Sequence, residues 1–159
     1  MATIRRSDSR LSILFELSAA ATAARELVAR AMAGSPLTPE EYAVYSVLFD
    51  EGPHGPTELA RRTGMPPTSM SHFVRAMLER GHARRAPSEA DRRSYRIVLT
   101  AAGLDAHGEA ARFFAEADRR FARALAIDDE AARATLRAMG AAAREAQAGL
   151  AEERVDALA

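Results

Sequence analysis

Four polar side chains recur at helical spacing in the middle of the chain. Thr68, Ser71, His72 and Arg75 occupy positions i, i+3, i+4 and i+7, which places them on one face of a helix. Each can form hydrogen bonds with bases or phosphates, and an arginine can bind the O6 and N7 atoms of guanine together. An isolated helix face of this kind is usually only solvated, so the pattern by itself leaves both interpretations open.

A second group of basic residues follows this helix. The group surrounds a polar turn at residues 87–91 and consists of Arg84, Arg85, Arg92, Arg93 and Arg96. An arginine at the tip of a loop suits the narrow minor groove, where the negative potential of DNA is concentrated. The presence of a second basic element beside the first favours nucleic-acid binding over a solvated face.

The net charge of the chain is zero, which alone argues against a nucleic-acid binder. The charge is unevenly distributed, however. Residues 58–96 carry 9 arginines against 4 acidic residues, a charge of +5, whereas residues 1–57 carry 5 against 7 and residues 97–159 carry 8 against 11. The positive charge is therefore concentrated in the segment that holds both basic groups.

The segments before these groups are predicted to be helical. Apolar or small residues repeat at spacings of three and four over residues 10–32, and a Gly-Ser-Pro sequence ends that helix. Thr38 and Glu41 have the spacing of a capping box, which predicts a second helix from Pro39.

Two short helices follow, one at residues 56–62 that Gly64 ends and one at residues 67–81. The second has the clearest apolar stripe of the chain, which consists of Met70, Phe73, Val74, Met77 and Leu78. Residues 95–99 alternate apolar and more exposed positions, as expected for one strand of a hairpin.

Two long helices complete the chain, and Thr100 and Asp128 are their predicted N-caps. Their apolar stripes have heptad-like spacing and exceed what one small subunit needs, which favours a homodimer over a monomeric bundle. A short helix, a tight turn, a second helix and a β-hairpin, in this order, are the elements of a winged helix-turn-helix.

We therefore predict a mainly α fold with a small β-hairpin wing, in which a winged helix-turn-helix stands between long N- and C-terminal dimerisation helices. Residues 1–159 form a single domain in this interpretation. The DNA-binding region covers residues 37–100, and the dimerisation helices cover residues 8–33 and 101–157.

The wing region resembles that of the MarR (multiple antibiotic resistance regulator) family, in which Asp-Arg-Arg leads through a strand into Leu-Thr-x-x-Gly. The residues that carry this resemblance are Asp91, Arg92, Arg93, Ile97, Leu99, Thr100 and Gly103, preceded by Leu59, Ala60, Arg80, Gly81 and Arg85. The resemblance covers residues 11–126 in element order, and its specific motifs lie within residues 58–103.

The resemblance implies a symmetric homodimer on a pseudo-palindromic site in duplex DNA, with helix 67–81 in the major groove and the wing in the minor groove. The DNA contacts that it implies are Thr68, Ser69, Ser71, His72, Arg75, Arg92 and Arg93. Asp91 would brace the wing through nearby arginines. His82 and Ala83 depart from the aliphatic pair that the family commonly has here, so we expect looser packing between the helix and the wing.

The resemblance also implies a small-molecule effector, often phenolic or amphipathic, that binds between the dimerisation helices and the DNA-binding region. The residues expected to line its site are Leu14, Tyr42, Tyr45, Phe49 and Phe113. Each of them, taken singly, is more typical of an ordinary hydrophobic core.

Other classes of function find little support. No nucleophile-base pair, paired carboxylates or phosphate-binding loop indicates an enzyme, and four histidines without a cysteine predict neither a metal site nor a cofactor. The chain has no apolar run of membrane-spanning or signal-peptide length, which favours a cytoplasmic location. We therefore predict a DNA-binding transcription regulator that acts as a ligand-responsive repressor. The alternative is a winged-helix module that mediates protein contacts without binding DNA.

Overall fold

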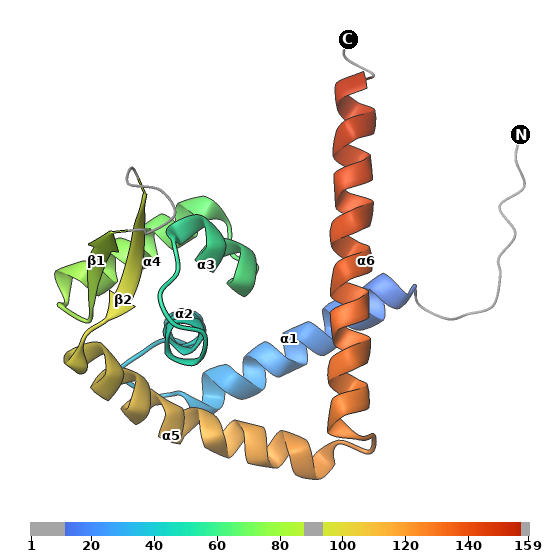
Figure 1. Cartoon of the computed structure of the whole chain (residues 1–159). Helices are drawn as coiled ribbons and strands as arrows, with labels where there is room; N and C mark the ends of the chain where they lie inside the picture. The colour runs from blue at the N-terminus through green and yellow to red at the C-terminus, as the bar shows by residue number, and fades with distance from the viewer. Residues whose placement is uncertain (1–11, 88–93, 157–159) are drawn as a thin grey trace, which may run out of the picture. The chain divides into compact units, whose positions relative to one another are not determined.

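Six helices and one antiparallel hairpin make up the described part of the chain, which comprises residues 12–87 and 94–156 of this computed structural model, with side chains described as far as residue 150. The elements, in chain order, are α1 (Ile13–Ala31), α2 (Pro39–Asp50), α3 (Pro56–Thr63), α4 (Pro67–Glu79), β1 (Ala83–Pro87), β2 (Tyr95–Leu99), α5 (Ala101–Ala124) and α6 (Asp129–Asp156) (Figure 1). They form two compact units, of which the first ends at Ala117 and the second begins at Asp118. The predicted fold class, a mainly α winged helix-turn-helix, is confirmed.

The core of the first unit lies among α2, α3, α4 and the hairpin. Its largest fully buried side chains are Leu37, Val44, Tyr45, Leu59, Met70, Met77 and Ile97. α2 contacts α3 and β2, α3 contacts α4, and α4 contacts β1. Because full burial of one large apolar side chain contributes about 1.5–3 kcal/mol, this cluster holds α4 in a fixed place beside the wing.

The ends of α2 and α3 follow from local hydrogen bonds that the sequence already indicates. Thr38 Oγ1 accepts a hydrogen bond from the Glu41 N–H at 3.2 Å, and Glu41 Oε2 accepts one from the Thr38 N–H at 3.0 Å. Gly64 ends α3 with a φ of 70°, in the left-handed region where a side chain is costly. Both predicted helix boundaries are confirmed.

β2 of the hairpin is bonded to the segment between α2 and α3 as well as to β1. Arg85 of β1 pairs with Ile97 of β2, and the Ile97 N–H also donates a hydrogen bond to the His54 carbonyl at 2.8 Å. The wing is therefore tied through backbone hydrogen bonds to the segment that precedes α3.

α5 begins where it meets the end of α4. Thr100 Oγ1 donates a hydrogen bond to the Gly81 carbonyl at 2.7 Å and accepts one from the Gly103 N–H at 3.2 Å. The Thr100 N–H donates to the His82 carbonyl at 3.0 Å. These bonds confirm Thr100 as the cap of α5 and fix its first turn against residues 81–82.

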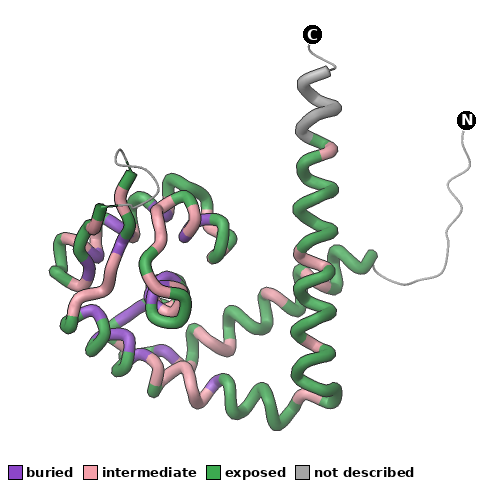
Figure 2. Tube along the Cα trace, viewed as in Figure 1, coloured by how far each residue is buried: buried purple, intermediate pink, exposed green. Residues whose placement is uncertain are grey.

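The second unit consists of the end of α5 and α6. No side chain of α6 is buried among those described, which end at residue 150 (Figure 2). The large apolar side chains that are exposed in this unit are Phe121, Ile127, Leu136 and Leu150. Helices in proteins are stabilised mainly by packing of an apolar face, so these side chains lack the burial that would stabilise α6.

Candidate DNA-binding site

The solvent-facing side of α4 carries the polar residues that the sequence selects. Thr68, Ser71, His72 and Arg75 are exposed, whereas Ser69 is half-buried. No acidic residue lies in the first turn of the helix. Hydroxyl, imidazole and guanidinium groups are therefore presented together to solvent.

The N-terminal end of α4 adds backbone donors to this face. Pro66 is the N-cap and supplies no side-chain hydrogen bond to the helix amides. The first amides of a helix have no intrahelical partner, and together with the helix dipole they attract anions. Ser71 donates its hydroxyl to the Pro67 carbonyl at 3.0 Å, which leaves its oxygen lone pairs as acceptors.

Some arginines of the basic segment already have acidic partners. Glu58 accepts hydrogen bonds from Arg61 at 3.0 Å and from Arg62 at 2.9 Å, and these bonds lower the pKa of Glu58 to about 2. Arg80 forms an ion pair with Glu41. Glu41 lies outside residues 58–96, so the charge of +5 counted over that segment overstates the positive charge that this surface offers to a ligand.

Arg75 and Arg85 differ from these arginines, because neither forms an ion pair within residues 12–87 and 94–150. The Arg85 guanidinium lies over the Tyr95 ring, 4.6 Å from the ring centroid. Both arginines line a notch of about 230 Å³ between α4 and the hairpin, together with Ser71 and Tyr95. The notch combines two cations with two hydroxyl groups, which are the groups that commonly contact the DNA backbone.

Arg85 and Tyr95 are not among the DNA contacts that the sequence predicts. The signal that could identify them is the pairing of Arg85 with Ile97, because side chains two residues apart on a strand share a face and Tyr95 then lies on the same face as Arg85. Only one of the two strands was predicted with defined residues, so this register was not accessible.

The tip of the wing held three predicted site residues. They are the predicted minor-groove contacts Arg92 and Arg93 and the predicted bracing residue Asp91. All three lie outside the described residues. On the described flanks of the wing, Arg84 and Arg96 are exposed.

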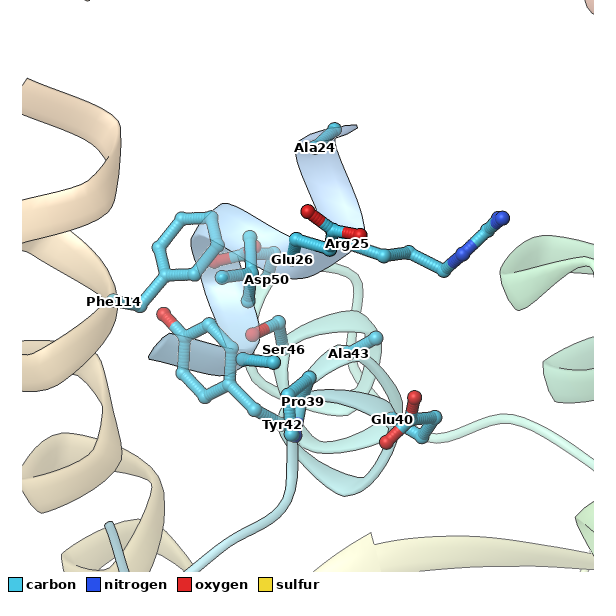
Figure 3. A pocket seen from close by; sticks show the side chains of 12 residues that line it. Ala24, Arg25, Glu26, Pro39, Glu40, Tyr42, Ala43, Ser46, Asp50 and Phe114 are labelled. Atoms are coloured by element: carbon cyan, nitrogen blue, oxygen red, sulfur yellow. The ribbon is translucent and has the colours of Figure 1, made fainter. Parts of the chain in front are cut away.

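A groove of about 850 Å³ lies in the first unit between α1, α2 and α5 (Figure 3). Its apolar lining residues are Ala24, Val28, Ala29, Pro39, Tyr42, Ala43 and Phe114. Its polar and charged lining residues are Arg25, Glu26, Glu40, Ser46 and Asp50. A groove of this volume with a largely apolar lining is within the range of small-molecule binding sites.

The five predicted effector residues have different surroundings. Tyr42 lines the groove, whereas Leu14 is exposed near the start of α1. Phe49 is exposed on α2 and stacks on His107, with ring centroids 4.6 Å apart. Phe113 packs against the hydrophobic core.

Tyr45, the fifth of them, is fully buried and bonds to His82. The Tyr45 hydroxyl lies 3.0 Å from His82 Nδ1, and burial is the main reason why the pKa of Tyr45 is raised to about 12. The two rings meet edge to face, with centroids 6.0 Å apart. The histidine that departs from the family pattern therefore has a hydrogen-bonding partner in the core.

His107 is a buried polar residue of α5 that contacts α2. Its Nε2 lies 3.1 Å from Ser46 Oγ, and its ring stacks on Tyr42 with the two planes 9° apart. Burial lowers the pKa of His107, and the charge of Asp50 partly opposes this effect. The neutral form of the ring is therefore favoured at neutral pH.

We expect the free energy of unfolding to fall as the pH decreases below about 6.5, the pKa of an unperturbed histidine. The lowered pKa means that His107 binds fewer protons in the folded chain than in the unfolded chain. Its contribution to stability is therefore complete above the unfolded pKa and is lost as the pH falls through the folded pKa. Urea unfolding followed by circular dichroism between about pH 8 and about pH 5 measures this, and His107→Gln should flatten the decline. Parallel curves for the variant and the parent would contradict the assignment to His107.

The described residues lack both a cluster of metal ligands and a membrane-spanning helix. No group of three or more histidine, cysteine, aspartate or glutamate residues there could hold a metal ion. No helix there combines the length and the apolar character needed to cross a membrane.

The order of two short helices and a hairpin, with the polar face on the second helix, defines the winged helix-turn-helix class of proteins. The model of the MarR family matches residues 37–95, which extend from just before α2 to the start of β2. Residues 37–95 are therefore similar to the corresponding region of MarR-family transcription regulators.

Solved structures of transcription regulators have the same fold. MosR of M. tuberculosis in complex with DNA is 24% identical with a TM-score of 0.71, over 86% of this chain and 98% of that one. The transcriptional repressor CouR, bound to a 23-mer DNA duplex, is 26% identical with a TM-score of 0.66, over 85% and 99% of the two chains. PcaV of Streptomyces coelicolor, in complex with its natural ligand, is 22% identical with a TM-score of 0.66, over 86% and 99%. A comparison with curated protein sequences found no match.

Proposed function

We propose that this protein is a ligand-responsive transcription repressor that binds duplex DNA as a homodimer in the cytoplasm. The observation that carries the proposal is the exposed polar face of α4 beside the notch of Arg75 and Arg85. Contacts to base edges and phosphates need donors of these kinds close together. CouR and MosR, which have the same fold, are bound to DNA in their solved structures.

In this proposal residues 37–100 form the DNA-binding region, with α4 in the major groove and the wing in the minor groove. The proposed contacts are Thr68, Ser69, Ser71, His72 and Arg75 on α4 and Arg92 and Arg93 on the wing, with Asp91 bracing the wing. Ser69, which is half-buried, would contact DNA less than its neighbours do.

The homodimer is supported by apolar side chains that one chain leaves in water. Ile13, Leu14 and Phe15 at the start of α1 are 63–66% exposed, and Leu136 and Leu150 of α6 are 58% and 64% exposed. We propose that residues 8–33 and 101–157 bury these side chains against a second copy, in an interface of about 2,000 Å² or more. Sedimentation at micromolar concentration should give a dimer, and a folded monomer would contradict the proposal.

The DNA-binding proposal is tested by selecting genomic fragments that the purified protein retains. We expect a pseudo-palindromic site with half-sites about 10 bp apart, since the two wings are related by a two-fold axis. If each subunit neutralises about four phosphates, the logarithm of the affinity should fall with the logarithm of the salt concentration with a slope of about −7. A protein that dimerises but retains no fragment would instead be a winged-helix interaction module.

The effector site that we propose is the groove between α1, α2 and α5. α2 contacts both α3 and β2, so a ligand that changes the position of α2 changes the support of the DNA-binding elements. CouR and PcaV have solved structures with p-coumaroyl-CoA and with a natural ligand, respectively. Addition of an effector should therefore release the protein from its DNA site.

A further inference from the structure

The groove between α1, α2 and α5 has an unequal set of charges. Three carboxylates line it, those of Glu26, Glu40 and Asp50, against the one guanidinium of Arg25. The formal charge of the lining is therefore 1 − 3 = −2, with histidine not counted because none lines the groove. None of the three carboxylates forms an ion pair within the described side chains, so their charges are not cancelled locally.

The guanidinium of Arg25 does little to offset these carboxylates. Its Nη2 donates a hydrogen bond to Thr22 Oγ1 on the same helix at 3.0 Å. In Figure 3 the Arg25 side chain extends away from the Tyr42 and Phe114 rings. A ligand seated against these rings would therefore meet carboxylates in preference to the guanidinium.

An aromatic wall forms one side of the groove. The Tyr42 and Phe114 rings have centroids 5.1 Å apart, and His107 stacks on Tyr42 with ring centroids 5.2 Å apart. Burial lowers the pKa of His107, so this histidine does not add a positive charge to the wall at neutral pH. The electron-rich faces of aromatic rings attract cations, more strongly where water is partly excluded.

We propose that the groove binds an organic cation with an aromatic or otherwise apolar body, such as a quaternary ammonium or a protonated lipophilic amine. This inference rests on the proposed effector site and names the class of ligand that the site takes. The apolar lining accepts the body of the ligand, the aromatic wall and the carboxylates of Glu26 and Asp50 attract its charge, and an anion of the same shape is repelled.

The test uses two ions of nearly the same size and shape but opposite charge, tetraphenylphosphonium and tetraphenylborate. The difference between their affinities measures the effect of the ligand's charge, because the apolar surfaces of the two ions are almost the same. Isothermal titration calorimetry of the full-length protein in sodium buffer should show that the phosphonium binds at least about tenfold more tightly than the borate. Equal affinity, preference for the borate, or binding of neither ion would overturn the proposal.

Charge variants place the effect in the groove. Glu26→Gln with Asp50→Asn should weaken phosphonium binding about tenfold and leave borate binding unchanged or stronger. Both side chains are exposed, so their substitution leaves the core intact. A negative charge at the C-terminal end of a helix is unfavourable, so removal of the Asp50 charge from the end of α2 should not destabilise the fold. Glu109→Gln, an exposed carboxylate of α5 outside the groove, is the matched control and should bind both ions as the parent does. A double variant that keeps the parent's preference, with an unchanged circular dichroism spectrum, would overturn the proposal.

The two proposals fail separately. Binding of the phosphonium is measured without DNA, and binding of DNA is measured without the phosphonium, by fluorescence anisotropy of a selected fragment. A parent protein that binds DNA and shows no preference for the cation retains the proposed function and loses this inference. A parent protein that prefers the cation but binds no DNA loses the proposed function and retains the ligand class.

Discussion

Gly103→Ala is expected to destabilise the first unit by about 3 kcal/mol or more, because overpacking against a rigid neighbour has costs of this order. A Cβ atom at this position would lie 2.0 Å from the His82 carbonyl oxygen and 2.9 Å from the carbonyl carbon. That carbonyl cannot move away freely, since it accepts the Thr100 N–H at 3.0 Å and the His82 N–H donates to Met77 at 2.9 Å. The first turn of α5 would have to shift away from the end of α4.

The matched control lies on the same helix. Gly108 has nothing within 4 Å of an added Cβ, so Gly108→Ala should stabilise the protein by about 0.5–1 kcal/mol through the better helix propensity of alanine. Urea unfolding of both variants measures the difference. A Gly103→Ala variant as stable as the parent would contradict the close approach of α5 to His82.

Arg75→Ala is expected to weaken binding to a selected DNA site by about 1–3 kcal/mol for each half-site, which is roughly 5- to 150-fold. Arg75 is exposed on the polar face of α4, lacks an acidic partner within the described side chains, and lines the notch that Arg85 also lines. Its guanidinium can therefore reach a base edge or a phosphate without first breaking an ion pair. Fluorescence anisotropy at a fixed salt concentration measures the loss.

Two further variants test whether this loss of affinity comes from a specific contact by Arg75. Arg112→Ala removes the same charge from an exposed position on α5 and should change the affinity less than about twofold. Arg75→Lys keeps the charge but cannot bind guanine O6 and N7 as a planar fork, so partial rescue would indicate a phosphate contact and absence of rescue a base contact. Equal losses for Arg75→Ala and Arg112→Ala would exclude a specific contact by Arg75.

The sequence alone determined the elements whose causes are local. Thr38 and Glu41 begin α2 through hydrogen bonds that span three residues, and Gly64 ends α3 through its own φ angle. The apolar stripe of residues 67–81 oriented α4 correctly, since Met70, Val74 and Met77 are buried and Arg75 is exposed. In each case the controlling interaction lies within one helical turn or follows helical periodicity.

The tertiary structure decided which chemistry-bearing side chains meet. Arg80 forms an ion pair with Glu41, 39 positions away in the sequence, and Tyr45 forms a hydrogen bond with His82, 37 positions away. No local sequence pattern specifies either contact. The same packing placed Arg85 beside Arg75 in the notch and left Tyr42 alone, of five predicted effector residues, in the groove. The periodicity of apolar residues in a helix or strand predicts which side of that element faces the interior. Which interior group each side chain then meets depends on how separate elements pack, and this is a property of the assembled core.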